Sequence, residues 1–335
     1  MSKSTVHQEI GIADAAYHLP GPAIDIVGWA AARNVSSQLV EELLANGCRY
    51  FYEGPEHSDA ELISGAIDQL VARQGDRIAQ IRYLVHSHTQ AFSMPAPPSS
   101  VLTELVQRYR LSPKLCFSVE HLACAGVVVA IERAARLLAA DSEARYALVV
   151  TSDRVFGNHK HRIRQNAGIQ SDGGSAILLS KEEMRCRLGA ISYKNFGELH
   201  EGPSNPRTIS LIGRYTWLHT KLAFEENSRA TGIPLPEYGQ LMPVNADRYY
   251  WVQIANALNL PESAFFLDNI RERGHACTND FAVNLVDRGF SLLDQGKPIS
   301  SCGQSNVGAY AVLTMLPLSN KTWVGSPADS SEKSP

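Results

Sequence analysis

The chain has 335 residues, of which 44% are hydrophobic and 19% charged, and its formal net charge at pH 7 is −3. This near-neutral balance excludes a basic nucleic-acid-binding surface, and no apolar run reaches the roughly 20 residues that span a membrane. The first residues, MSKSTVHQEIGIADAAY, lack the layout of a secretory signal peptide. Six cysteines without a Cys-x-x-Cys pair predict free thiols in a reducing cytoplasm, and neither a disulfide scaffold nor a zinc site.

Apolar patterns along the chain alternate between helices and strands. Helical spacing begins at a capping box formed by Ser58 and Glu61, and a continuous apolar run over 145–153 indicates a fully buried strand. The sequence predicts helices over 58–75, 99–111, 121–138, 246–260 and 279–296, and strands over 81–90, 114–122, 145–153, 171–180, 265–270 and 308–316.

The two halves of the chain look like duplicated α/β units. Gly173-Gly174 leads into AILLS in the same way as Gly308-Ala309 leads into AVLTML. The polar tail 319–335 predicts a disordered segment.

A cysteine stands at the start of a predicted buried helix. Cys124, in HLACAGVVVAIERAARLL, falls in or near the first turn, where unpaired N–H groups and the positive end of the helix dipole collect. A thiol there has a lowered pKa, and small neighbours leave room for a substrate to approach. Taken alone, Cys124 is better explained as a small apolar residue packed at a helix start.

The order and spacing of several motifs resemble the ketoacyl-ACP synthase III group of the thiolase superfamily over roughly residues 10–317. The matching segments are SVEHLACAGVVVA, ALVVTSD, SDGGSAILL and TQAFS. The resemblance implies an α/β thiolase fold with two duplicated α/β halves in a five-layer αβαβα arrangement. It assigns 1–182 to the N-terminal half with the nucleophile Cys124, 183–318 to the C-terminal half, and 319–335 to a disordered tail. It also implies a homodimer, in which Phe92 lines the acyl tunnel.

Two departures from the family pattern bear on function. Val244 stands where condensing members carry a histidine, and His275 stands where they carry an asparagine, with Asp280 five residues further on. This arrangement resembles the acyltransferase branch of secondary, polyketide-type metabolism, with a Cys-His-Asp site. Loss of the second hydrogen-bond donor to the thioester carbonyl should slow decarboxylation, but acyl transfer remains possible. In isolation, His275 fits a buried structural histidine and Asp280 a first-turn acid of the next helix.

By the same resemblance, the oxyanion hole comes from the backbone N–H groups of Cys124 and Gln304, the latter in SCGQSNVG. The coenzyme A signature is reduced to Arg49, which favours an acyl group presented on carrier-protein phosphopantetheine. Arg162, Arg164 and Arg214 are candidates to face an acidic carrier protein.

Other histidines are better explained by structure or solvent than by chemistry. His86 and His88 share one strand face, which is compatible with a metal, but no third ligand is evident. His159 and His161 indicate a solvated loop, and His200 a surface loop. We therefore predict no metal.

Together these residues predict a cytoplasmic, homodimeric acyltransferase of natural-product biosynthesis. It would form an acyl-Cys124 intermediate from a carrier-protein or coenzyme A thioester and pass the acyl group to a hydroxyl, amine or thiol of a small molecule, with His275 as base and Asp280 orienting it. It would need no cofactor beyond the thioester that delivers the substrate. The first alternative is a decarboxylative ketoacyl synthase III that forms carbon–carbon bonds. The second is a non-catalytic carrier-binding partner, which the retained cysteine disfavours.

Overall fold

The computed structural model describes residues 9–89, 93–96, 98–155, 157–164 and 168–318. Its main feature is a nine-stranded sheet in the order β11-β12-β13-β10-β1-β9-β6-β4-β5. These strands are β1 (Gly11–His18), β4 (Ile81–Ser87), β5 (Leu115–Val119), β6 (Tyr146–Asp153), β9 (Gly173–Ser180), β10 (Cys186–Asn195), β11 (Gln240–Met242), β12 (Ile299–Gln304) and β13 (Ala309–Pro317).

The sheet consists of two halves with the same strand order and the same directions. In the first half β5, β4 and β6 run parallel, and β9 is antiparallel to both β6 and β1. In the second half β11 and β12 run parallel, and β13 is antiparallel to both β12 and β10. Phe265 forms a parallel bridge to Leu241 of β11, in the place that β5 occupies beside β4. This repeat confirms the predicted duplication of α/β halves.

The halves join through a short contact between β1 and β10, where Gly11 pairs with Arg187 and Ile12 with Cys186. The first-half strands all end by Ser180, and the second-half strands begin at Cys186. The domain boundary between residues 182 and 183 stays a prediction, and the predicted disordered tail lies outside the described residues.

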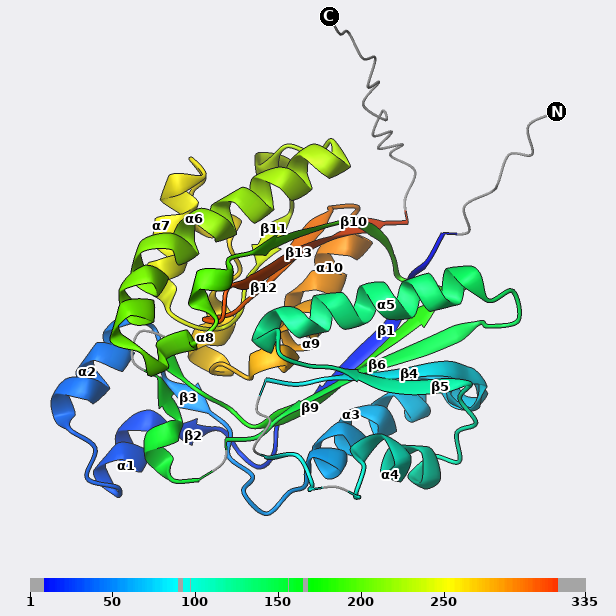
Figure 1. The fold of residues 1–335 in the computed structure, drawn as a ribbon, viewed down its shortest axis with the longest axis horizontal. Helices are drawn as coiled ribbons and strands as arrows, with labels where there is room; N and C mark the ends of the chain where they lie inside the picture. The colour runs from blue at the N-terminus through cyan, green and yellow to red at the C-terminus, as the bar shows by residue number, and fades with distance from the viewer. Residues whose placement is uncertain (1–8, 90–92, 97, 156, 165–167, 319–335) are drawn as a thin grey trace, which may run out of the picture.

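Helices cover both outer faces of the sheet halves and fill the space between them (Figure 1). The outer helices of the first half are α3 (Asp59–Gln74) and α4 (Val101–Arg108), and those of the second half are α6 (Pro206–Thr231) and α7 (Arg248–Ala257). Between the halves lie α5 (Gly126–Ala140), α9 (Asp280–Asn284) and α10 (Phe290–Asp294), and a π-helical turn over Leu285–Gly289 joins the last two. One apolar cluster fills the centre, and one lies under each outer layer. The result is the predicted five-layer αβαβα arrangement.

Short elements lie at the edge of this core. They are α1 (Ile26–Ala31), α2 (Ser37–Ala45), α8 (Asp268–Glu272), and two small sheets, β2 (Ile24–Asp25) with β3 (Tyr50–Phe51) and β7 (Ile163–Arg164) with β8 (Gly168–Ile169). Among the described residues, no helix combines the length and apolar character needed to cross a bilayer.

Most predicted elements are confirmed with ends shifted by a few residues. The capping box is present: Glu61 N–H donates to Ser58 Oγ, and Ser58 N–H donates to the Glu61 carboxylate. The strand predicted over 265–270 is wrong. Phe265 alone pairs with β11, and the polar residues that follow form α8, because the apolar run is too short to sustain a strand.

Candidate active site

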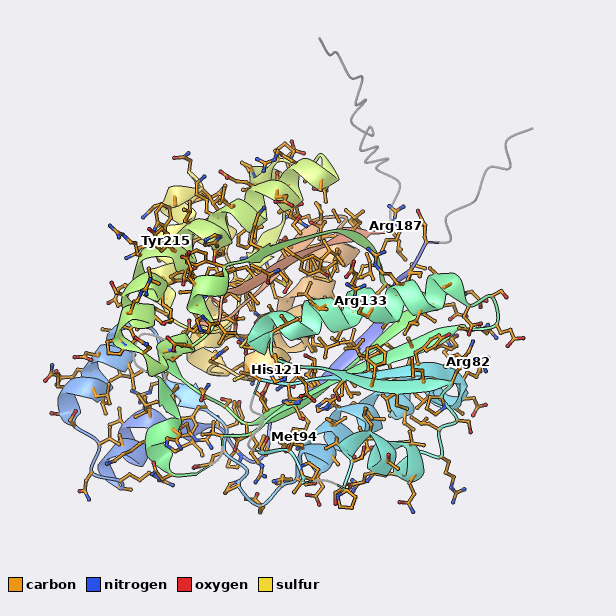
Figure 2. The ribbon with its side chains drawn as sticks, viewed as in Figure 1. Arg82, Met94, His121, Arg133, Arg187 and Tyr215 are labelled. Carbon is orange, nitrogen blue, oxygen red and sulfur yellow. The ribbon has the colours of Figure 1, made fainter. Side chains whose placement is uncertain are left out.

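Cys124 lies in a 3₁₀ turn, Ala123–Ala125, between the end of β5 and the start of α5. It is 6% exposed. Two residues just before it have positive φ angles, 64° at His121 (labelled in Figure 2) and 44° at Ala123. Such backbone strain costs free energy and clusters at functional sites. The predicted position of the cysteine at a helix start is therefore confirmed, on an unusually tight turn.

His275 reaches Cys124 from the second half of the chain. Its Nε2 lies 3.7 Å from Cys124 Sγ. The backbone of His275 is held on both sides, because its N–H donates to Ile169 O and its carbonyl accepts from Ser171 N–H. Gly274, with φ +66°, makes this possible, since a Cβ there would come within 2.9 Å of Ser171 Oγ and 3.0 Å of Ile169 O.

Asp280 completes a line of three side chains. Its Oδ2 lies 2.6 Å from His275 Nδ1. The carboxylate also accepts from the backbone N–H groups of Asn245 (2.7 Å) and Ala276 (2.8 Å) and from the Asn245 side-chain amide (3.2 Å). It is at the same time a first-turn acid of α9, as the structural interpretation expects, and its role in orienting His275 for chemistry stays a prediction.

The electrostatics favour a charged cysteine–histidine pair. The hydrogen bond from Cys277 holds the pKa of Cys124 well below its usual value, with help from the charge and hydrogen bond of His275 and from Thr89, and against the effect of burial. Burial lowers the pKa of His275, but Asp280 and Cys124 more than offset this and raise it well above its usual value. The arrangement therefore stabilises a thiolate beside an imidazolium.

Sequence analysis missed four residues that shape the site. Cys277 Sγ lies within 4.8 Å of both Cys124 Sγ and the His275 ring nitrogen, and Thr89 Oγ1 lies 3.6 Å from Cys124 Sγ. Asp153 accepts from Thr89 N–H (2.7 Å) and Thr278 N–H (2.9 Å), so it ties both neighbouring segments together. Asn245, as described, holds Asp280. Thr89 and Asp153 stand inside the segments TQAFS and ALVVTSD quoted above, whereas Cys277 and Asn245 stand in none of the quoted segments.

Val244 occupies the same small cavity as the cysteine. The cavity has a volume of about 10 Å³ and includes Cys124, Val244, Cys277, Cys302 and Gly303 in its lining. The site thus presents an aliphatic side chain where the family resemblance expects a second hydrogen-bond donor.

Strand β12, which ends at Gln304, passes close to the backbone of Cys124, where the oxyanion hole is predicted. A Cβ at Gly303 would come within 2.4 Å of Cys124 O, so only glycine lets this strand pass the cysteine backbone. The next residue, Gln304, accepts hydrogen bonds from Thr220 and Tyr250 through its side chain, both at 3.0 Å. The roles of the Cys124 and Gln304 N–H groups stay a prediction, and Phe92 lies outside the described residues.

The prediction that Arg162 faces a carrier protein is wrong. Arg162 is 3% exposed and pairs with Asp172 and Glu53, so it is a structural residue that cannot meet a partner. Its guanidinium instead fixes the loop before β9. Arg214 is exposed on α6, and the side chain of Arg164 lies outside the described residues. Arg49, the candidate coenzyme A remnant, pairs with Asp25.

The remaining histidines agree with their structural interpretation. His86 is buried, lies 3.1 Å from Ser152 Oγ and stacks on His88, and burial lowers the pKa of His86 to about 3. His161 and His200 are exposed, and the side chain of His159 is outside the described residues.

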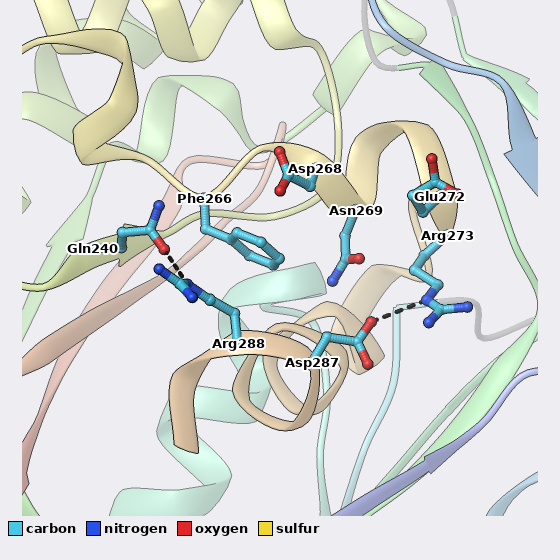
Figure 3. A pocket seen from close by; sticks show the side chains of 8 residues that line it. All are labelled: Gln240, Phe266, Asp268, Asn269, Glu272, Arg273, Asp287 and Arg288. Carbon is cyan, nitrogen blue, oxygen red and sulfur yellow. Dashed lines mark hydrogen bonds and ion pairs between the residues drawn. The ribbon is translucent and has the colours of Figure 1, made fainter. Parts of the chain in front are cut away.

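A larger hollow of about 610 Å³ lies away from the cysteine (Figure 3). It is lined by Gln240, Phe266, Asp268, Asn269, Glu272, Arg273, Asp287 and Arg288. Arg273 pairs with Asp287 at 3.0 Å, and this ion pair braces the residue next to Gly274. The lining of the hollow includes none of the three aligned side chains.

Comparisons with known proteins agree with this geometry. A family model described as FAE1/Type III polyketide synthase-like protein matches residues 50–202. The solved structure of the acyltransferase ChlB3 is 20% identical, with a TM-score of 0.79 over 94% of this chain and 100% of that one. AbyA1, a tetronic acid condensing enzyme, is 19% identical, with a TM-score of 0.76 over 92% and 99%.

The 3-oxoacyl-(acyl carrier protein) synthase III FabH from Pseudomonas aeruginosa PAO1 is 18% identical, with a TM-score of 0.73 over 92% of this chain and 98% of that one. No curated protein matches the chain. The chain therefore has the thiolase fold of these ketoacyl synthase III-like structures, and the fold that the resemblance implied is confirmed.

We expect Gly274→Ala to displace His275, because the new Cβ would collide with the loop at Ser171. The free energy of unfolding should fall by about 1–3 kcal/mol, and alkylation of Cys124 by iodoacetamide at pH 7 should slow by about 10-fold or more as the thiolate loses its imidazolium. Gly213→Ala is the matched control, since nothing lies within 4 Å of a Cβ there. Unchanged stability and alkylation in Gly274→Ala would contradict this description of the loop.

Proposed function

We propose that this protein is an acyltransferase of natural-product biosynthesis, which forms an acyl-Cys124 intermediate from an acyl thioester and passes the acyl group to a hydroxyl, amine or thiol. The observation that carries the proposal is the hydrogen-bonded line Cys124–His275–Asp280, with apolar Val244 as its neighbour. Such a line supplies one nucleophile and one acid–base group, which is what acyl transfer requires.

In the first step the Cys124 thiolate attacks the carbonyl carbon of the donor thioester. A new S–C bond forms, the bond to the pantetheine sulfur breaks, and His275 Nε2 gives its proton to the leaving thiolate. The backbone N–H groups of Cys124 and Gln304 would stabilise the oxyanion of the tetrahedral intermediate.

In the second step His275 is neutral and takes the proton of the acceptor as its oxygen, nitrogen or sulfur attacks the acyl carbon. Cys124 leaves as a thiolate, and the imidazolium forms again. Asp280 keeps the Nδ1 proton directed at its own carboxylate throughout, so that Nε2 always faces the reaction.

The first alternative is decarboxylative condensation, and one structural neighbour, AbyA1, is named as a condensing enzyme. Decarboxylation develops an enolate on the thioester oxygen, which condensing sites stabilise with two donors. Here Val244 offers none, and the side-chain amide of Asn245 already donates one hydrogen bond to Asp280. A non-catalytic, carrier-binding role is the second alternative, and the ordered three-residue site argues against it.

We further propose that the donor is an acyl carrier protein, and that no cofactor is needed beyond the phosphopantetheine or coenzyme A that delivers the acyl group. The reduced nucleotide signature at Arg49, which pairs with Asp25, supports a carrier-bound donor. The synthase III neighbour is named for acyl-carrier-protein substrates. Of the three arginines first considered for docking, Arg214 is exposed and stays a candidate.

The discriminating experiment supplies acylated protein with either malonyl carrier protein or the small nucleophile hydroxylamine. We expect acyl transfer to hydroxylamine, and carbon dioxide release slower than in a two-donor site by about 10²–10³-fold. His275→Ala should slow transfer by about 10²–10⁴-fold, and Asp280→Asn by a smaller factor. Robust release of carbon dioxide with a β-ketoacyl product, abolished by His275→Ala, would make the protein a condensing enzyme.

A homodimer is the proposed assembly, and the edge of the sheet supports it. β5 has no strand on its outer side among the described residues, and Leu115 on it is 45% exposed. An open edge strand with an apolar side chain is a template for pairing with a second copy.

We therefore expect sedimentation at twice the mass of the chain, and Leu115→Lys should shift the protein toward the monomer. Val71→Lys, at an exposed apolar residue of α3, should leave the mass unchanged. A monomeric wild-type protein at micromolar concentration would contradict the proposed dimer.

A further inference from the structure

We propose that Cys124, His275 and Cys277 together bind a zinc ion, which reversibly withdraws the nucleophile and the base of the site. Their three ligand atoms all lie within 4.8 Å of one another, and all three residues are buried. Within the described part of the chain, this is the one group of three histidine, cysteine or acidic side chains that converge so closely. No Cys-x-x-Cys spacing signals it, because the ligands come from two distant segments.

The donor set selects the metal. Two thiolates and an imidazole suit zinc, whereas magnesium and calcium require oxygen ligands. In a tetrahedral zinc site the sulfur–nitrogen separation is about 3.6 Å, from bond lengths of about 2.3 Å and 2.0–2.1 Å. The observed distance from Cys124 Sγ to His275 Nε2 is 3.7 Å. These two ligands therefore need almost no rearrangement to share an ion.

Each ligand has an outer hydrogen-bond partner, which is a regular feature of metal sites. Asp280 lies 2.6 Å from His275 Nδ1, which leaves Nε2 free to face the two sulfurs. Gln170 Nε2 donates to Cys277 Sγ at 3.5 Å, and Thr89 Oγ1 lies 3.6 Å from Cys124 Sγ. The small cavity lined by both cysteines has about the volume that one water needs, so it can hold the fourth ligand of the ion.

Binding requires no oxidant or reductant. Zinc takes both cysteines as thiolates and His275 as neutral imidazole, so two protons go to solvent for each ion bound. Cys124 sulfur is then a ligand and no longer attacks a carbonyl, and His275 Nε2 no longer moves a proton. Removal of zinc restores the free site, and the activity at this site therefore depends on zinc concentration.

Cys277 is the residue that separates this proposal from simple acyl transfer. Zinc requires its sulfur as a ligand, whereas in acyl transfer Cys277 forms no bond to the substrate and acts only through its hydrogen bond to Cys124. Cys302 is the matched control. It is a buried cysteine that lines the same cavity, yet its sulfur is not part of the three-ligand group.

The test is a titration of the full chain with cobalt and zinc ions, in a phosphine reductant that keeps the thiols reduced. We expect one equivalent to bind with a cobalt–thiolate charge-transfer band. Cys277→Ser and Cys277→Ala should weaken the affinity by at least about 100-fold, more than loss of an outer partner does, and Cys302→Ser should not. Zinc should also block alkylation of Cys124 in the wild type, and a chelator should restore it.

The proposal is overturned if the wild type binds no metal at micromolar concentration, or if both Cys277 variants bind as tightly as wild type. It also fails if Cys302→Ser loses affinity as much as they do. The titration and the alkylation assay involve no acyl donor, so their outcome is independent of whether the protein transfers acyl groups.

Discussion

The buried carboxylate of Asp280 is the constraint on which the rest of the site depends. At 1% exposure, its charge would be costly to bury without full hydrogen bonding. The donors come from His275, Ala276 and Asn245, so the carboxylate fixes the histidine loop against the segment that follows β11. Because the ring of His275 binds the carboxylate through Nδ1, the same hydrogen bond leaves Nε2 facing Cys124.

The duplicated fold explains why these groups meet where they do. Cys124 follows β5 in the first half of the sheet, whereas His275, Asp280 and Asn245 come from the second half. Asp153, at the end of β6, joins the two by accepting from Thr89 and Thr278. Neither half alone contains all three aligned side chains, so the line Cys124–His275–Asp280 exists only when the five layers are assembled.

The sequence predicts those parts of the structure that depend on local pattern. The apolar run 145–153 becomes β6, and the capping box at Ser58 begins α3. The strand predicted over 265–270 was wrong, because the three apolar residues at its start do not distinguish a strand from a buried loop. The long helix α6 and strands β1, β10 and β12 were not predicted, since their burial depends on contacts with distant elements.

The candidate site likewise contains residues that local sequence motifs identify and residues that only long-range contacts reveal. Cys124, His275 and Asp280 stand in recognisable motifs, and the structure brings them together. Thr89 and Asn245 contact site residues that lie far away in the chain. Arg162 is buried in an ion pair with Asp172, and its burial cannot be inferred from its charge alone. Hydrogen bonds between residues far apart in the chain leave no recognisable pattern in the amino-acid sequence.

The central claim is that Cys124 carries the acyl group. The most direct measurement is the intact mass of the protein, followed by peptide mapping, after incubation with a panel of acyl groups presented both on carrier protein and on coenzyme A. The account predicts one acyl mass on Cys124, formed faster from the carrier-bound donor, and no adduct in Cys124→Ala. An adduct on Cys277 or Cys302, or no adduct from any thioester, would contradict it.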